Sequence, residues 1–331
     1  MQSKVVFEKL RASVVFFFSN IDHYDLIFVN LGELIVAKVK NKETHRYIIK
    51  EVGKKVFWPW VFDALFDWGV IAATFYIAYL WNNPVGYFLS IFVIGTRQHA
   101  LAILGHDGTH FTVHKNKIIN DTVSDVLALL PIGFSTAGYR SLHSRHHAKL
   151  NTADDPELMH RSSKSPQWDL PITLTKIMKF ALKDVFGYSI SDYWMIISNS
   201  KPQSKTVFAL MFAWHAVFIS AFLYLNLFWI PLIWYISLLT TFMMYFRLRT
   251  WLEHQGDEFT HRLRLNWFER LIVAPHNVEL HYEHHSYPSV SYKNLEQVRM
   301  LMPEKEVITL KDLMLKYKHS VCIPSGTPTK T

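Results

Sequence analysis

Four apolar segments of this chain are long enough to cross a bilayer, and they constrain the fold more than any other feature. The hydrocarbon core of a membrane is about 30 Å thick and requires roughly 20 helical residues. The segments run from Val61 to Trp81, from Gly86 to Leu104, from Thr206 to Leu225 and from Phe228 to Phe246. We therefore expect an all-α, multi-pass membrane protein with four transmembrane helices.

The four segments form two pairs, each joined by a short turn, at residues 81–84 and 226–231. Two helical hairpins are expected. Neither turn contains Lys or Arg, whereas the outer ends of the segments are flanked by basic residues. These are Lys54, Lys55, Lys115, Lys117, Lys201, Lys205, Arg247 and Arg249. Because basic residues collect on the cytoplasmic side of membrane proteins, both termini are expected to be cytoplasmic.

Three charged residues lie within the apolar segments, where exposure to lipid would be costly. We expect Asp63 and Asp67 to lie near the headgroups and Arg97 to pack against another helix. A fifth apolar stretch, residues 123–134, is too short to span, and we interpret it as interfacial or re-entrant.

Composition limits the kind of metal site that this chain can build. Its one cysteine, Cys322, excludes an intrachain disulfide and a thiolate centre, so imidazole and carboxylate must supply any ligands. The formal net charge of +8 is typical of basic segments that flank membrane helices. The chain has no pattern typical of a nucleic-acid-binding module.

Three clusters hold many of the 18 histidines. They are His106-Asp-Gly-Thr-His110, His143-Ser-Arg-His146-His147 and His281-Tyr-Glu-His284-His285. On a helix, positions three or four apart share a face, so each cluster can direct its imidazoles at one point. Imidazole is a good ligand for iron, zinc, copper or nickel. Eight histidines are too many for one zinc, which usually takes four ligands, so two metal ions are expected. With four spans, all three clusters fall on the cytoplasmic side.

The order and local context of these clusters resemble the integral-membrane fatty acid desaturase superfamily, which also contains membrane hydroxylases, alkane monooxygenases and carotenoid ketolases. The resemblance covers roughly Trp58 to Met302 and includes Asp154-Asp155-Pro156-Glu157 after the second cluster. We expect a desaturase-like membrane domain over residues 58–303, with a cytosolic helical cap that carries the metal site. Residues 1–57 are expected to form a cytosolic or interfacial segment, and residues 304–331 a cytosolic tail.

The resemblance also adds one residue to the predicted ligand set. Members of the superfamily typically carry a further histidine after the last span, and His254 matches that position. Asn277, four residues before His281, is a candidate for contact with the metal through water. Metal-bound imidazoles usually donate their other N–H to a carboxylate or carbonyl, and four carboxylates lie close in sequence. They are Asp107, Asp155, Glu253 and Glu283.

The activity that the resemblance implies is oxidation of an unactivated C–H bond in a lipid or acyl chain by a non-haem di-iron centre with O₂. A fatty acid desaturase is the leading hypothesis, and a membrane hydroxylase or ketolase is the alternative. The chain carries no dinucleotide-binding, iron–sulfur or haem motif, so electrons are expected from ferredoxin or from a b-type cytochrome with its reductase.

Two other classes place histidines in membrane proteins. An intramembrane zinc protease needs HExxH, but Asp107 follows His106. A metal transporter places its ligands near the bilayer midplane, whereas these clusters are expected outside the spans. Tight binding of about two irons per chain would favour the oxidase, and loosely exchangeable zinc would favour transport.

Overall fold

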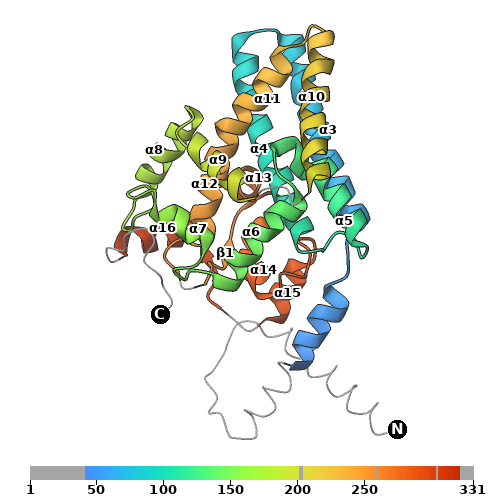
Figure 1. Cartoon of the computed structure of the whole chain (residues 1–331). Helices are drawn as coiled ribbons and strands as arrows, with labels where there is room; N and C mark the ends of the chain where they lie inside the picture. Colours follow the sequence, from blue (N-terminus) through green and yellow to red (C-terminus); the bar gives the residue numbers. More distant parts are fainter. Residues whose placement is uncertain (1–41, 201–203, 258, 303–304, 321–331) are drawn as a thin grey trace, which may run out of the picture. The chain divides into compact units, whose positions relative to one another are not determined.

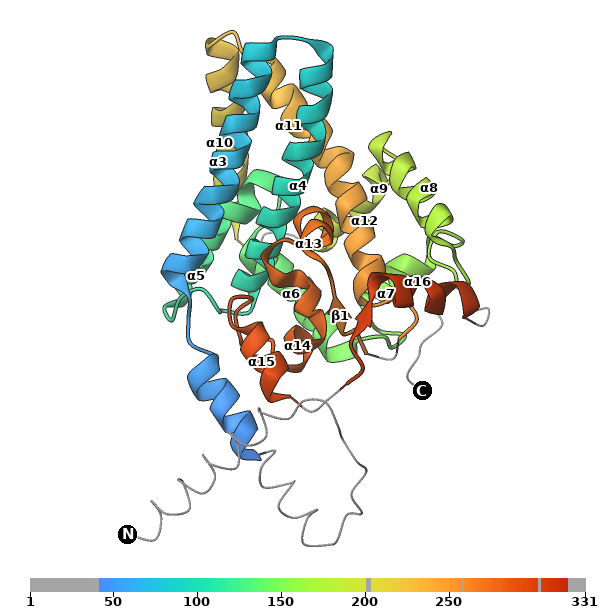
Figure 2. The same cartoon turned by 180° about the vertical axis from the view of Figure 1, so that it is seen from behind.

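The computed structural model describes residues 42–200, 204–257, 259–302 and 305–320. Its contacts divide the chain into two units, Met1–Arg46 and Tyr47–Thr331. The second unit is mostly helical and holds the elements labelled in Figures 1 and 2. The expected segment at residues 1–57 lies largely outside the described residues.

Four candidate spans are present in the described part of the chain, as predicted. They are α3 (Phe57–Trp81), α4 (Pro84–Thr109), α10 (Lys205–Tyr224) and the stretch Trp229–Glu253, made of α11 (Trp229–Leu239) and α12 (Thr241–Glu253). In both views α3 and α4 run side by side and meet at the turn after Trp81 (Figures 1 and 2). Asn83 begins α4 by accepting a hydrogen bond from the Gly86 N–H, and Pro84 occupies the first helical position, which favours proline.

Helix α4 runs further than the sequence predicted. It continues past Leu104 to Thr109, so His106 lies in its last turn and not beyond the span. Polar side chains here do not end the helix, because they face other protein segments and not lipid. The helix ends where Phe111 adopts a positive φ of 57°.

The last span is interrupted at Thr240, which has non-helical dihedral angles between α11 and α12. The neighbouring Thr241 hydroxyl donates to the Ile91 carbonyl of α4 at 2.7 Å. A side chain at Gly95 would clash there, since a Cβ atom would lie 2.1 Å from the Thr241 oxygen. This glycine lets α12 approach α4 closely on its way to the histidine-bearing end.

The charged residues of α3 and α4 face each other. Arg97 donates to Asp67 at 2.9 Å, which confirms that Arg97 packs against another helix. Asp67 is fully buried within the protein and also contacts His276 at 2.7 Å, while its depth relative to the headgroups stays a prediction. Asp63 accepts from Tyr292 and pairs with Lys293. Pairing removes the cost of exposing these charges to lipid.

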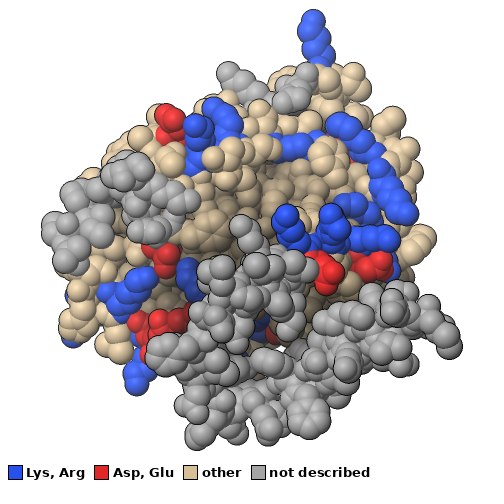
Figure 3. Space-filling view, turned by 90° about the horizontal axis from the view of Figure 1, so that it is seen from below, with Lys and Arg blue, Asp and Glu red and all other residues tan. Residues whose placement is uncertain are grey.

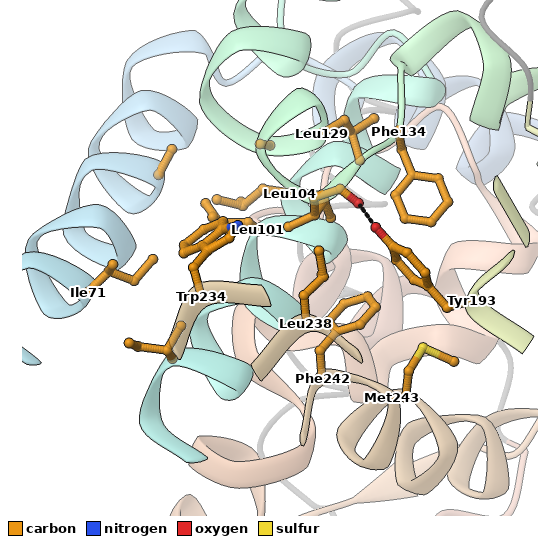
Figure 4. Packing of buried hydrophobic residues seen from close by; sticks show 14 of the residues in the cluster. Ile71, Leu101, Leu104, Leu129, Phe134, Tyr193, Trp234, Leu238, Phe242 and Met243 are labelled. Atoms are coloured by element: carbon orange, nitrogen blue, oxygen red, sulfur yellow. Dashed lines mark hydrogen bonds between the residues drawn. The ribbon is translucent and has the colours of Figure 1, made fainter. Parts of the chain in front are cut away.

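The segment after α4 bends sharply. Helix α5 (Lys117–Ser124), η2 (Asp125–Leu129) and η3 (Leu130–Ile132) precede α6 (Thr136–Lys149) at an angle of 86°. The apolar stretch 123–134 therefore does not continue as one straight span. It packs into the core beside Trp234 and Leu238, and the Tyr193 hydroxyl donates to the Ile132 carbonyl (Figure 4).

The remaining elements are short. They are η1 (Ile48–Val52), α7 (Pro156–Ser162), α8 (Leu174–Val185), α9 (Ile190–Asn199), α13 (Trp267–Val273), η4 (Pro275–Leu280), α14 (His281–Ser286), α15 (Leu295–Leu301) and α16 (Leu310–His319). Strands β1 (Leu263–Arg264) and β2 (Ile308–Thr309) pair in parallel, a small departure from the expected all-α fold. Within the predicted tail, α16 buries Leu313 and Tyr317 against Trp168 and Trp251.

Candidate metal centre

The histidine clusters lie on four elements that approach one another below the long helices. His106 and His110 stand at the end of α4, and the second cluster lies on α6. His254 caps the end of α12, and α14 begins at His281 and carries the third cluster. Figures 1 and 2 show α6 and α14 close together at this end of the unit.

Helix α6 is held in place by polar contacts at its start and along one side. The Asp125 carboxylate accepts from the backbone N–H and the hydroxyl of Thr136 at 2.6 and 2.7 Å. Arg140 donates to the Thr109 carbonyl at 2.7 Å and pairs with Asp121 at 2.6 Å. A cation at the free carbonyls of a helix C-terminus is favourable, and here it also joins α6 to α4. The first and second clusters are aligned in this way.

Five histidines from three elements form one group. They are His106, His110, His143, His147 and His284, and one ring nitrogen of each lies within 4.8 Å of the others. The Nε2 atom of His143 is 2.7 Å from that of His106 and 2.9 Å from that of His147. The Nε2 atoms of His284 and His147 are 3.1 Å apart.

The other four histidines lie beside this group. His146, His254 and His285 bring ring nitrogens within 4.8 Å of one another, and Glu253, His254 and His281 do the same. The Nε2 atom of His281 is 2.8 Å from that of His254 and 3.0 Å from that of His285. The rings of His147 and His285 stack with centroids 4.1 Å apart, so the two groups are adjacent. All nine predicted ligands are thus brought together.

Burial keeps most of these imidazoles neutral. Removal from water, followed by the neighbouring histidines, lowers the pKa of His110, His143 and His284 well below its ordinary value. The same causes hold the pKa of His281 and His285 well below that value. Burial also lowers the pKa of His147, to about 4. Neutral imidazole is the form that binds metal.

The ring nitrogens of these histidines lack suitable hydrogen-bond partners when no cation is bound. Several Nε2 atoms face one another, and their lone pairs repel unless a proton or a metal ion lies between them. The Nε2 atoms of His110 and His146 are buried and have no hydrogen-bond partner among the described residues. Buried polar atoms are normally paired, so the arrangement fits a site built for metal ions.

Three carboxylates approach the rings. Asp155 accepts from His146 Nδ1 at 2.9 Å, and Glu253 lies 3.4 Å from His281 Nδ1. Glu157, which the sequence analysis did not single out, lies 3.8 Å from His146 Nδ1. Burial alone lowers the pKa of His146, but the charges of Glu157 and Asp155 outweigh it and raise the pKa above its ordinary value. The proximity of Glu157 to Asp155 in sequence was the one available signal.

Three other candidates contact something else. Asp107 accepts from Thr112, Ser291 and the Tyr292 N–H, and so ties the end of α4 to the segment after α14. Glu283 lies on the side of α14 that faces Arg262 and Arg299, at 2.6 and 3.1 Å. The Asn277 amide donates to the Tyr292 carbonyl at 3.2 Å. None of the three has a hydrogen bond or ion pair with a histidine of the three clusters in the described part of the chain.

An apolar cavity adjoins the histidines. Its wall includes Leu129, Ile132, Phe134, Leu142, Met243 and Phe246. Tyr139 and Glu157 line both this cavity and the small space that contains His143, His146 and His254. The Tyr139 ring stacks on His143 with centroids 5.4 Å apart. The cavity thus meets the space beside the histidine rings at Tyr139 and Glu157.

Replacing Asp155 with Asn is expected to weaken metal retention about 10- to 100-fold. The carboxylate fixes the His146 ring by accepting its Nδ1–H, and the neutral amide can present a donor to the same nitrogen. Dialysis against graded chelator followed by elemental analysis measures the change. The exposed Asp154, next in sequence, gives the matched control D154N. Equal retention by D155N and the native protein would contradict the role of Asp155.

Comparison with known proteins identifies related chains. The model of the family described as Fatty acid desaturase matches residues 82–307. An omega-6 fatty acid desaturase, chloroplastic, of Glycine max is 25% identical over 242 residues, which cover 63% of this chain and 54% of that protein. The Arabidopsis thaliana protein of the same name is 31% identical over 105 residues, 32% of this chain and 22% of that protein. The dihydrorhizobitoxine desaturase of Bradyrhizobium elkanii is 25% identical over 266 residues, 72% of this chain and 74% of that protein.

The matched region spans about half the length of the Glycine max relative and about a fifth of the Arabidopsis one. All three clusters, His254 and the cavity-lining residues of α6, α7, α9 and α12 fall within the region that the family model matches.

Proposed function

Since this chain belongs to the fatty acid desaturase family, we propose that its nine clustered histidines hold two iron ions that oxidise an unactivated C–H bond in a lipid or acyl chain. The observation that supports this most directly is the convergence of nine imidazoles, most of them buried and neutral, in two adjacent groups. Bound iron would supply the redox chemistry with O₂. In our proposal the reaction introduces a double bond.

The nine proposed ligands divide between two ions. His106, His110, His143, His147 and His284 would hold one, and His146, His254, His281 and His285 the other. The donor set consists of imidazole with nearby carboxylate, which suits non-haem iron. In this proposal Asp155 and Glu253 orient His146 and His281 through Nδ1, which leaves each Nε2 for the metal.

The residues around the ions position the substrate and exclude water. Most of the clustered histidines are buried, and Tyr139 and Glu157 lie between them and the apolar cavity. An acyl chain held along this wall would place its C–H bonds beside the metal ligands. Such positioning and exclusion of water are what a protein contributes when the metal performs the difficult step.

The membrane arrangement follows from the four candidate spans. We propose that α3 with α4, and α10 with α11 and α12, form two hairpins whose turns face away from the cytoplasm. Both termini and the metal centre would then be cytoplasmic, in a helical cap between the flanking segments 1–57 and 304–331. The basic residues at the opposite ends of the spans support this orientation.

The proposed function requires an external electron donor, since the chain carries no reductase motif. We propose ferredoxin or a b-type cytochrome with its reductase. Lys and Arg side chains are spread over the described part of the face seen from below in Figure 3. A basic face attracts an acidic donor and speeds its association.

The experiment that tests the proposal is mass spectrometry of total lipids after expression in a host that lacks the activity. A product lighter by two hydrogens is expected, because removal of hydrogen from adjacent carbons gives an alkene. A product heavier by one oxygen would identify a hydroxylase instead. Unchanged lipids together with exchangeable zinc and no tightly held iron would overturn the oxidase assignment in favour of a metal-transport or metal-binding role.

A further inference from the structure

Arg161 is a buried cation in the wall of the apolar cavity. It lies on α7, one turn after Glu157, and its side chain lines the cavity together with His160. Only 3% of its surface is exposed to solvent. Most cations in proteins lie at the surface, and a buried one normally has a paired anion.

Three arginines line this cavity, and two of them have carboxylate partners. Arg247 is 2.5 Å from Asp184, and Arg249 is 2.6 Å from Glu253. The Arg161 guanidinium has no hydrogen bond or ion pair with any residue that the structure describes, and its Nε and Nη1 atoms are fully buried. A guanidinium has five donors in a fixed planar arrangement, and none can be removed by deprotonation.

The nearby carboxylates are committed to other groups. Asp192, on the same cavity wall, pairs with Lys164 at 3.0 Å and His160 at 3.6 Å. Glu157 faces the Nδ1 atoms of His143 and His146, at 3.9 and 3.8 Å. Neither carboxylate forms an ion pair with Arg161 among the described residues, so the guanidinium donors stay free.

We propose that Arg161 binds an anionic oxygen group of the substrate, a carboxylate or a phosphate, while the substrate's hydrocarbon chain lies along the apolar wall. This inference rests on the proposed function and deepens it, since it assigns a charged amphipath, and not a neutral ester, to the cavity. The planar guanidinium fits both groups through two parallel hydrogen bonds. The apolar wall formed by Leu129, Ile132, Phe134 and Met243 then receives the chain.

The preference is measurable without turnover. The iron-loaded whole chain, in nanodiscs of zwitterionic lipid, is titrated with octanoate, octyl phosphate and octanol, with empty nanodiscs as the blank. The three probes share a chain length and differ in the head group. The native protein is expected to bind octanoate or octyl phosphate about tenfold or more tightly than octanol, the difference typical of a hydrogen bond to a charged group. The preferred anion tells a carboxylate substrate from a phosphate one.

Three variants assign the preference to this side chain. R161Q is expected to lose it while binding octanol as the native protein does, and R161K, which keeps the charge, to retain part of it. R264Q removes an exposed arginine from β1 and is expected to bind all three probes like the native protein. Iron content and the thermal unfolding transition, measured on the same samples, show whether each variant is folded.

Two results would overturn the inference. One is equal affinity of the native protein for octanol and both anions, a result that does not depend on any variant. The other is an unchanged preference in folded, iron-loaded R161Q. Both are independent of the lipid analysis that tests the proposed function, so a failed oxidation assay with an Arg161-dependent preference would reject the reaction but keep the anion site.

Discussion

Substitution of His146 by Ala is expected to reduce lipid oxidation below detection while leaving membrane insertion intact. The Nε2 atom of His146 is buried and has no hydrogen-bond partner among the described residues, and Asp155 holds its Nδ1 atom. Its Nε2 is therefore available as a metal ligand beside His254 and His285. Without it, this group keeps His254, His281 and His285. We expect about half of the bound iron to be lost, since the five-histidine group remains complete.

Three measurements separate loss of chemistry from loss of the protein. Lipid mass spectrometry reports the product, elemental analysis reports iron per chain, and extraction of membranes with alkaline carbonate reports insertion. H319A is the matched control, because His319 is exposed at the end of α16. Normal product formation by H146A would remove the basis for the proposed centre.

Loss of the Glu283 carboxylate is expected to destabilise the protein by about 3–5 kcal/mol, the usual effect of removing one partner from a buried ion pair. Glu283 is fully buried and accepts from both Arg262 and Arg299. In E283A these two guanidinium groups lose the anion that they share. The adjacent His284 and His285 depend on the same helix, so iron content should also fall.

The thermal unfolding transition in detergent measures this effect, and iron content is followed on the same samples. E296A is the control, since Glu296 lies exposed on α15, three residues before Arg299. A transition of E283A at the same temperature as that of E296A would show that the two buried ion pairs contribute little to the fold.

Features with a local origin were predictable. The four candidate spans follow from runs of apolar residues, and spacings of three and four place His143, His146 and His147 on neighbouring positions of one helix. The ends of the spans were predicted less well. The polar residues after Leu104 pack against other segments of the protein, with Gly108 beside Ser124 of α5 and Asp107 bonded to Ser291 and Tyr292, so α4 continues through them.

The roles of the carboxylates were not predictable from local sequence. Asp107 and Asp155 each lie close in sequence to a histidine cluster, yet Asp155 contacts His146 whereas Asp107 contacts Ser291 and Tyr292. Glu283 lies between His281 and His284 in sequence, but its carboxylate accepts a hydrogen bond from Arg262. Which way a carboxylate points depends on the segments that pack beside it, and those segments are distant in sequence.

A helical chain with four candidate spans could be read from the residues alone, as could ligand chemistry limited to imidazole and carboxylate and three clusters that each present several rings on one face. The division of those rings into two adjacent groups, the approach of Glu157 to them, and the position of Arg161 without a partner among the described residues depended on packing between distant segments. These two kinds of feature differ in the range of the interactions that produce them. Hydrophobicity and helical spacing act over a few residues, whereas the contacts of a buried charge are made between elements that are brought together only when the whole domain packs.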